Sequence, residues 1–227
     1  PIAGFQRRLT WKNITFFFKL IKSMRKAGKI IRDFKPDVVI GVGGYASGPV
    51  LRVASKRKIP TLIQEQNSFP GITNRILARS VDKICVAYDN MERFFPKEKL
   101  YVTGNPVRQN VVEMETGREE AARCFGFNPD KKTVFVTGGS IGARSINLGI
   151  RNGLEQFYEN NIQIIWQTGK EYIEQAKEAV NKDLTELIYV TDFISRMELA
   201  YAAADLVVSR AGAIAISEIQ AICKPAV

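Results

Sequence analysis

Short apolar runs rich in β-branched residues recur along this chain and alternate with segments of helical periodicity. The runs are DVVIGV (37–42), TLIQEQ (61–66), KICVAY (83–88), LYVTG (100–104), TVFVTGG (133–139), QIIWQTG (163–169), LIYVTDF (187–193) and DLVVSR (205–210). Strands that are apolar on both faces and separated by helices are typical of parallel sheets covered by helices. The pattern therefore predicts an α/β fold.

A polar, charged stretch at residues 109–132 interrupts this alternation between the fourth run and the fifth. The chain has 227 residues, enough for one large or two small domains at roughly 100 to 200 residues per domain. We place a domain boundary near Asn110, which gives residues 1–110 and 111–227. Each half contains a strand, a glycine-rich turn and a helix, so we expect two similar nucleotide-binding-like units that face each other.

Apolar residues recur at helical spacing through residues 11–34, which predicts one long helix. Its aromatic residues Phe16 to Phe18 point around more than half of the circumference, so some aromatic surface must lie outside a single core-facing stripe. Residues 1–35 also hold ten Lys or Arg against one Asp, a net +9 of the whole chain's +10.

This basic aromatic helix allows three interpretations: a core helix with a solvated lysine face, a membrane-surface contact and a nucleic-acid contact. The positive charge is confined to one element instead of covering the whole surface, which argues against nucleic acid.

Two glycine-rich loops follow predicted strands, GVGGYASGP (41–49) and TGGSIGARSIN (137–147). In a parallel sheet such loops lead into helix N-termini, where unpaired N–H groups and the helix dipole favour phosphate. Neither loop continues into G-K-[ST], so hydrolysis of a nucleoside triphosphate at a P-loop is excluded. Both loops are candidate phosphate or substrate sites, and a purely structural turn is the alternative for each.

Polar residues also stand just beyond several predicted strands, at the edge where open α/β sheets bind ligands. They are Glu65, Gln66, Asn67, Asn105, Arg108, Asp192 and, in the helix that follows the last strand, Glu218. A single residue of this kind is more often a cap or turn residue. Ser195 with Glu198, for example, predicts a capping box.

Several kinds of chemistry are excluded by composition. The chain has no His and only three scattered cysteines, Cys85, Cys124 and Cys223, so we expect no catalytic triad, zinc site or disulfide framework, and a reducing compartment. It has no D-x-D pair for a divalent metal, so we predict no metal and no cofactor. A sugar-nucleotide diphosphate would then be met by helix N-termini and an arginine such as Arg108.

The ends of the sequence predict an internal fragment of a longer protein. The first residues, PIAGFQRR, lack an initiator Met and the layout of a signal peptide, and the last, AICKPAV, stop where a new strand would begin. No apolar run approaches the roughly 20 residues that span a bilayer.

Six ordered motifs closely resemble those of the MurG family, the bacterial enzymes that add N-acetylglucosamine to lipid I to give lipid II for peptidoglycan. The motifs are GVGGYASGP, IQEQNSFPGITNRILAR, VTGNPVR, VTGGSIGARSIN, VTDFISRM and SRAGAIAISE, and the resemblance extends over nearly all of the chain from Lys35 onward. It implies a GT-B fold, with two Rossmann-like parallel-sheet domains that face a cleft and are both incomplete here. Residues 1–110 would form the acceptor and membrane-binding domain, and residues 111–227 the UDP-sugar domain.

The resemblance also implies which residues bind which group. For UDP-N-acetylglucosamine they are Asn67, Arg108, Ser140, Ile194, Ala213, Ile214, Ala215, Ile216, Ser217 and Glu218. Within this set, Arg108 and Ser140 would contact the diphosphate, Ile194 the uracil, Glu218 the ribose hydroxyls, and Asn67 would lie near the sugar. The acceptor diphosphate would contact Gly43, Gly44, Tyr45 and Ser47. An anionic membrane would contact Trp11, Phe16, Phe17, Phe18, Lys19 and Lys22, which implies a peripheral enzyme on the cytoplasmic face of the bacterial inner membrane.

Two parts of the family pattern are missing from this sequence. These are the first glycine-rich loop, whose histidine is proposed to assist catalysis, and the glutamines that contact the donor sugar. We therefore expect this fragment to be inactive by itself, and the residues present identify no catalytic base. Two alternatives remain: a UDP-N-acetylglucosamine epimerase or other GT-B enzyme with a soluble substrate, which needs no basic aromatic helix, and a non-enzymatic basic binding module.

Overall fold

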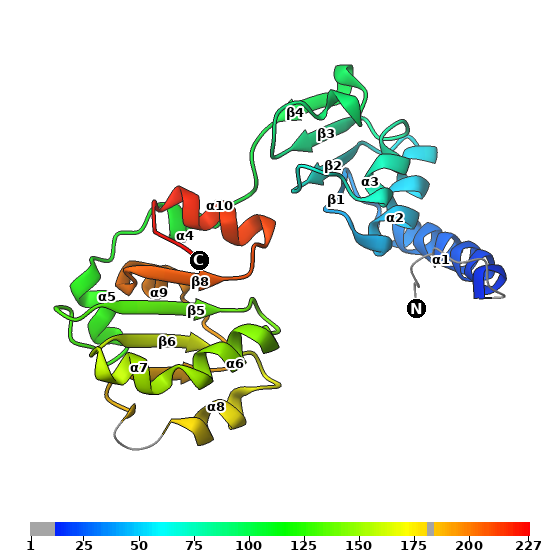
Figure 1. Cartoon of the computed structure of the whole chain (residues 1–227). Coiled ribbons are helices and arrows are strands. Elements are labelled where there is room, and N and C mark those ends of the chain that lie inside the picture. Colours follow the sequence, from blue (N-terminus) through cyan, green and yellow to red (C-terminus); the bar gives the residue numbers. More distant parts are fainter. Residues whose placement is uncertain (1–11, 181–183) are drawn as a thin grey trace. The chain divides into compact units, whose positions relative to one another are not determined.

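The chain folds into two compact units, which a computed structural model describes over residues 12–180 and 184–227, with side chains from Phe18 onward (Figure 1). The N-terminal unit is Pro1–Asn105 and the C-terminal unit is Pro106–Val227. The division thus falls five residues before Asn110, near which the sequence analysis placed the domain boundary.

The N-terminal unit is a parallel sheet with helices. Its elements are α1 (Lys12–Phe34), β1 (Val39–Gly41), α2 (Gly44–Lys56), β2 (Thr61–Glu65), α3 (Ile72–Leu77), β3 (Lys83–Val86), two short 3₁₀ turns η1 (Met91–Arg93) and η2 (Lys97–Lys99), and β4 (Leu100–Val102). The strands pair in parallel in the order β1-β2-β3-β4. The long helix predicted for residues 11–34 is confirmed from Lys12 onward.

The core of this unit lies between the inner strands and the helices. Leu51 of α2, Ile63 of β2 and Ile84 of β3 are fully buried there, and α1 packs along α2 with Ala27 and Ile31 buried (Figure 1). The outer strands differ from the prediction of uniformly covered strands, since Ile40 of β1 is 61% exposed and Val102 of β4 is 60% exposed. As edge strands, they have a neighbouring strand on only one side within the described residues.

The C-terminal unit is a second parallel sheet. Its elements are α4 (Gln109–Val112), α5 (Arg118–Cys124), β5 (Thr133–Thr137), α6 (Arg144–Asn152), α7 (Leu154–Glu159), β6 (Gln163–Gln167), α8 (Ile173–Ala179), β7 (Ile188–Thr191), α9 (Met197–Ala203), β8 (Leu206–Ser209) and α10 (Ala213–Ala221). Helices cover both faces of the sheet (Figure 1). Alternate residues of β5 show this: Phe135 packs with α5, α9 and α10, whereas Val134 and Val136 pack with α6, α7 and α8.

The strand order of the C-terminal sheet is β7-β6-β5-β8, with every pairing parallel. The chain moves outward from β5 to β6 and β7, and then returns to place β8 on the other side of β5. Such a reversal opens a crevice between the loops at the carboxyl ends of β5 and β8, the strands on either side of the reversal, which is where open α/β sheets bind ligands. These loops are residues 138–143 after β5 and 210–212 after β8.

Candidate functional site

A cavity of about 620 Å³ lies at the carboxyl ends of β5, β6 and β8 in the C-terminal unit. Its wall includes six of the residues that the sequence predicted for the UDP-sugar: Arg108, Ser140, Ile194, Ile214, Ala215 and Glu218. The structure therefore brings together residues from four separate motifs. Ala213, Ile216 and Ser217 lie on the same helix, α10, but outside the lining of the cavity.

Glu218 is the most buried charged group of this cavity, with 2% of the residue exposed. Arg108 grips its carboxylate at two points: Nε donates to Oε1 at 2.7 Å and Nη2 donates to Oε2 at 3.0 Å. The hydroxyl of Tyr201 donates to the same Oε2 at 3.1 Å. The arginine side chain is 48% exposed, so the ion pair extends from the buried carboxylate to an accessible guanidinium.

These contacts shift two pKa values. The hydrogen bond to Glu218 raises the pKa of Arg108, so this side chain stays cationic. Burial, together with the negative charge of Glu218 and the hydrogen bond to it, raises the pKa of Tyr201 well above its usual range. The tyrosine therefore remains a neutral hydrogen-bond donor at any ordinary pH.

Gln167 ties two loops of the cavity together. Its Nε2 donates to Thr137 Oγ1 and to the carbonyl of Gly139, both at 3.1 Å, and its Oε1 accepts the backbone N–H of Ile194 at 2.9 Å. The side chain is buried at the end of β6, so it fixes the glycine-rich loop after β5 relative to the segment after β7.

The glycine-rich loop after β5 requires its glycine at position 142 for close packing. Gly142 has φ +84°, and a Cβ there would lie 2.0 Å from the carbonyl oxygen of Thr168. This glycine is therefore structural. Gly139 and Ser140, by contrast, are exposed and line the cavity, just before α6 begins at Arg144.

A second cavity, of about 360 Å³, lies in the N-terminal unit between the first glycine-rich loop and the loop after β2. Gly43, Gly44, Tyr45 and Asn67 line it, so the structure unites most of the predicted acceptor residues with one residue predicted for the donor sugar. The turn depends on glycine, because Gly43 and Gly44 both have positive φ, +87° and +74°. Ser47 lies one turn into α2, outside this lining, and its hydroxyl donates to the carbonyl of Gly44.

Glu65 organises the loop that carries Asn67. This carboxylate is 2% exposed and accepts four hydrogen bonds: Oε1 from the backbone N–H and the Nδ2 of Asn67, and Oε2 from the N–H of Gly71 and the Nδ2 of Asn74, at 2.9 to 3.1 Å. Asn74 Oδ1 is a buried acceptor with no hydrogen-bond partner among the described residues. Although Asn67 lies in a loop, this hydrogen-bond network therefore holds it in place at the cavity.

The basic aromatic helix exposes part of its apolar surface. Phe18 is 69% exposed, and Lys19 and Lys22 are also exposed. Trp11 lies outside the described residues, as do the side chains of Phe16 and Phe17. In the part of the chain that is described, no helix is long and apolar enough to cross a bilayer.

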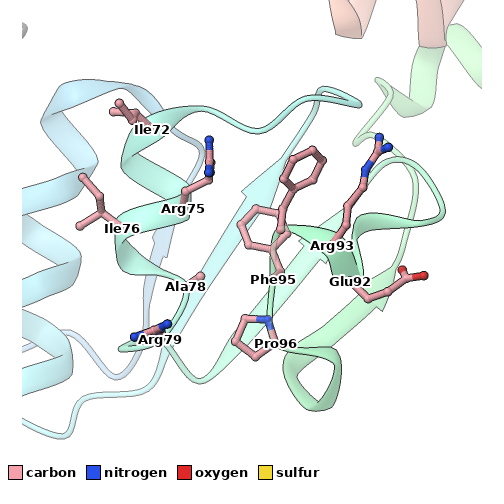
Figure 2. A pocket seen from close by; sticks show the side chains of 10 residues that line it. Ile72, Arg75, Ile76, Ala78, Arg79, Glu92, Arg93, Phe95 and Pro96 are labelled. Carbon is pink, nitrogen blue, oxygen red and sulfur yellow. The ribbon is translucent and has the colours of Figure 1, made fainter.

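A larger hollow of about 730 Å³ lies elsewhere in the N-terminal unit and contains none of the predicted residues. Figure 2 shows Ile72, Arg75 and Ile76 of α3 on one side, and Arg93 and Phe95 of the segment after β3 on the other. It is lined by three arginines and one glutamate, Glu92.

The sequence analysis missed Gln167, Tyr201 and Phe193 among the residues that line the cavity of the C-terminal unit. Gln167 could have been found, since it is a polar residue at the carboxyl end of a predicted strand, like those that were chosen. Tyr201 gave no such signal, because it stands among leucine and alanine in a helix and its pattern is that of a core residue. Across residues 12–180 and 184–227, no cluster of three acidic or sulfur side chains is arranged to hold a metal ion.

Two models of one protein family match the chain. That of the glycosyltransferase family 28 N-terminal domain matches residues 1–86, and that of the family 28 C-terminal domain matches residues 133–227. The two ranges include both glycine-rich loops. They also include every lining residue of the 360 Å³ and 620 Å³ cavities except Arg108, but only part of the lining of the hollow in Figure 2.

Individual proteins give a closer comparison. A protein of Phocaeicola vulgatus named UDP-N-acetylglucosamine--N-acetylmuramyl-(pentapeptide) pyrophosphoryl-undecaprenol N-acetylglucosamine transferase is 54% identical over 228 residues, which cover 100% of this chain and 61% of that protein. The chain spans about 60% of the length of the curated relatives it matches.

Solved structures give the same picture. MurG of Acinetobacter baumannii is 31% identical with a TM-score of 0.60, over 95% of this chain and 57% of that one. The UDP-GlcNAc 2-epimerase of Neisseria meningitidis, bound to UDP-GlcNAc, has a TM-score of 0.61 over 97% of this chain and 65% of that one. At 15% identity the epimerase is a likeness of fold alone. The predicted fold, two Rossmann-like parallel-sheet units of GT-B type, is confirmed.

Proposed function

The chain belongs to glycosyltransferase family 28, and we propose that the complete protein transfers N-acetylglucosamine from UDP-N-acetylglucosamine to N-acetylmuramyl-(pentapeptide) pyrophosphoryl-undecaprenol, a step of peptidoglycan synthesis. The observation that carries this proposal is the 54% identity, along the whole chain, to a relative named for that reaction. The tests below use the protein at the full length of such relatives.

In this proposal the cavity of the C-terminal unit binds the UDP part of the donor. Its chemistry supports the assignment: it combines a buried carboxylate able to accept two ribose hydroxyls, a half-exposed arginine suited to a diphosphate, and exposed loop backbone at Gly139 and Ser140. Ile194, at the loop that Gln167 fixes, contacts the uracil, and Asn67 of the N-terminal unit contacts the sugar.

The acceptor diphosphate binds the cavity of the N-terminal unit, against the backbone of Gly43 and Gly44. Positive φ at both glycines turns the chain into the start of α2, which has thirteen residues and can offer its first N–H groups to an anion. Tyr45, 57% exposed at the same turn, shapes the entrance.

The reaction inverts the configuration at the anomeric carbon of the donor sugar. The acceptor's sugar hydroxyl attacks the anomeric carbon, the bond from that carbon to the UDP oxygen breaks, and negative charge develops on the departing diphosphate. Arg108 and the loop N–H groups near Ser140 stabilise that charge. The hydroxyl proton passes to a general base that the described residues do not identify.

We further propose that α1 binds an anionic membrane surface, since the acceptor carries a lipid chain. Exposed Phe18 and Ile21 beside Lys19 and Lys22 support this contact, because apolar side chains enter the interface while each nearby lysine adds about 1 kcal/mol of attraction to anionic lipid. The location would be peripheral, on the cytoplasmic face of the bacterial inner membrane.

The test of the reaction is an assay of sugar transfer with labelled UDP-N-acetylglucosamine and the undecaprenyl-linked acceptor. We expect labelled, lipid-extractable product and release of UDP. Conversion of the UDP-sugar without any acceptor would instead favour an epimerase, and salt-sensitive nucleic-acid binding without UDP binding would favour a basic binding module.

The membrane contact is tested by flotation with vesicles of phosphatidylglycerol and phosphatidylethanolamine. The double variant Lys19→Gln/Lys22→Gln should bind about 30-fold more weakly, because two lysines contribute about 2 kcal/mol. Lys97→Gln/Lys170→Gln, which removes two exposed lysines elsewhere, is the matched control. Equal binding by both double variants would contradict the contact through α1.

A further inference from the structure

Tyr201 is a buried tyrosine in an otherwise apolar layer. It is 1% exposed on α9, among the buried residues Leu199, Ala200, Ala202 and Ala203, and its ring packs edge-on against Phe135 with centroids 5.4 Å apart. A phenylalanine would fill the same space. Burying a hydroxyl costs about 1 to 3 kcal/mol unless it is hydrogen-bonded, so the presence of the Tyr201 hydroxyl indicates a role in hydrogen bonding.

The hydrogen-bond partner of this hydroxyl is Glu218. Among the described residues, Arg108 and Tyr201 supply the hydrogen bonds that the carboxylate accepts from side chains. The two partners differ in mobility: Arg108 has a long, half-exposed side chain, whereas Tyr201 is fixed by its packed ring. If Arg108 takes the donor diphosphate, its two bonds to Glu218 break and the bond from Tyr201 is kept.

We propose that Tyr201 is a positioning residue whose hydroxyl holds the Glu218 carboxylate toward the ribose of the donor while Arg108 moves to the diphosphate. This inference rests on the proposed function, in which the cavity binds a UDP-sugar. The two ribose hydroxyls replace the two bonds from Arg108, and Tyr201 keeps the carboxylate in one orientation throughout. A carboxylate without that third bond would rotate, and binding the ribose would then require ordering it.

The test is calorimetric titration of the full-length protein with UDP and with 2′,3′-dideoxy-UDP, which lacks both ribose hydroxyls. Tyr201→Phe should bind UDP about 5- to 20-fold more weakly, a smaller loss than direct removal of a hydrogen bond to a charged group, because Tyr201 acts through Glu218. Its affinity for the dideoxy nucleotide should stay within about twofold of wild type. In turnover, KM for the UDP-sugar should rise while kcat stays within about twofold.

Tyr172→Phe is the matched control. Tyr172 packs beside Trp166 in the same unit, and its hydroxyl has no hydrogen-bond partner among the described residues, so the same loss of one oxygen should leave both affinities unchanged. A second control uses the Glu218→Gln background. There Tyr201→Phe should add less than about twofold, because the group it positions is already altered.

Three outcomes would overturn the inference. Equal loss of affinity for UDP and dideoxy-UDP in Tyr201→Phe would indicate general damage to the cavity, and no loss for either would show that the hydroxyl has no role in binding. A full further loss in the Glu218→Gln background would mean that Tyr201 acts through another group. Failure of the wild-type protein to bind UDP is a separate result, which would overturn the proposed function itself.

Discussion

Arg108 and Glu218, 110 residues apart in the chain, form a two-point ion pair with donor–acceptor distances of 2.7 and 3.0 Å. The pair joins the segment just before α4 to α10 across the wall of the cavity. Paired, parallel hydrogen bonds between guanidinium and carboxylate are stronger and more directional than a single contact. Each partner therefore has a structural role here besides the contact with ligand that the sequence suggested for it.

The first prediction concerns stability. Arg108→Met would leave a carboxylate that is 2% exposed with only the hydroxyl of Tyr201. Removing one partner of a fully buried pair costs about 3 to 5 kcal/mol, and since Arg108 is half-exposed we expect about 2 to 3 kcal/mol less free energy of unfolding. The double variant Arg108→Met/Glu218→Gln should recover at least about 1 kcal/mol relative to the sum of the single changes.

Denaturant unfolding of the four proteins in this cycle measures the coupling. Strictly additive losses would mean that the ion pair contributes no coupling energy, contrary to its geometry.

The second prediction concerns donor affinity. Glu218→Ala should weaken binding of UDP-N-acetylglucosamine by about 1.5 to 3 kcal/mol, because it removes the charged carboxylate that accepts hydrogen bonds from the ribose hydroxyls in the proposed complex. Titration calorimetry gives the value. Glu119→Ala, an exposed glutamate paired with Arg123 one turn along α5, is the control and should leave affinity unchanged. Unaltered binding by the Glu218 variant would place the ribose elsewhere.

Much of the fold follows from the period of apolar residues. Each of the eight runs named from the sequence contains a strand of the parallel sheets, because parallel sheets covered by helices favour apolar residues in their strands, although the edge strands β1 and β4 are partly exposed. The pattern of apolar residues does not determine the order of the strands in the sheet. The reversal that places β8 beside β5, and with it the position of the cavity, depends on packing between segments far apart in sequence.

Two predictions made from local sequence patterns missed contacts between segments that are far apart in the chain. Ser195 and Glu198 were predicted to form a capping box, but α9 begins at Met197 without a side-chain cap, and Glu198 instead accepts hydrogen bonds from Arg196 and Asn110. Likewise, the family resemblance implied separate ligand contacts for Arg108 and Glu218, and the motifs that carry it could not show that the two side chains meet. An ion pair across 110 residues is decided by the fold, which spacing along the chain does not contain.

The third prediction concerns the glycine-rich loop after β5. Gly142→Ala places a methyl group 2.0 Å from the carbonyl oxygen of Thr168 on a backbone with φ +84°, so the loop must shift. We expect a loss of at least about 2 kcal/mol in the free energy of unfolding, and weaker UDP binding because Gly139 and Ser140 move with it.

Gly149→Ala is the matched change for that loop. Gly149 lies within α6 with open space around the added methyl group, so alanine should be neutral or should stabilise the protein by up to about 1 kcal/mol. Thermal unfolding and UDP titration of the two variants separate the requirement at position 142 from a general intolerance of added methyl groups.

The last prediction concerns acid. Asp205 is partly buried, which opposes its ionisation, but hydrogen bonds from Arg118, the N–H of Thr133 and Lys132 outweigh burial and lower its pKa to about 2. A carboxyl whose pKa is lower in the folded protein stabilises the fold above its ordinary pKa, and this stabilisation is lost as the pH falls through the folded value. The advantage of wild type over Asp205→Asn should therefore be constant above about pH 5 and shrink between about pH 4 and pH 2.

We expect the plateau of that difference to be about 1 to 2 kcal/mol, because Asp205 joins the starts of β5 and β8 through the 2.5 Å contact with Arg118 and the 2.8 Å bond from Thr133. Unfolding curves of both proteins from pH 2 to pH 7 measure it. Glu174→Gln, which removes an exposed carboxylate paired with Lys177, should differ from wild type by less than about 0.5 kcal/mol at every pH. A difference for Asp205→Asn that stays undiminished at pH 2 would show that Asp205 acts through packing or hydrogen bonds that the protonated carboxyl keeps and asparagine lacks, and that its charge does not stabilise this end of the sheet.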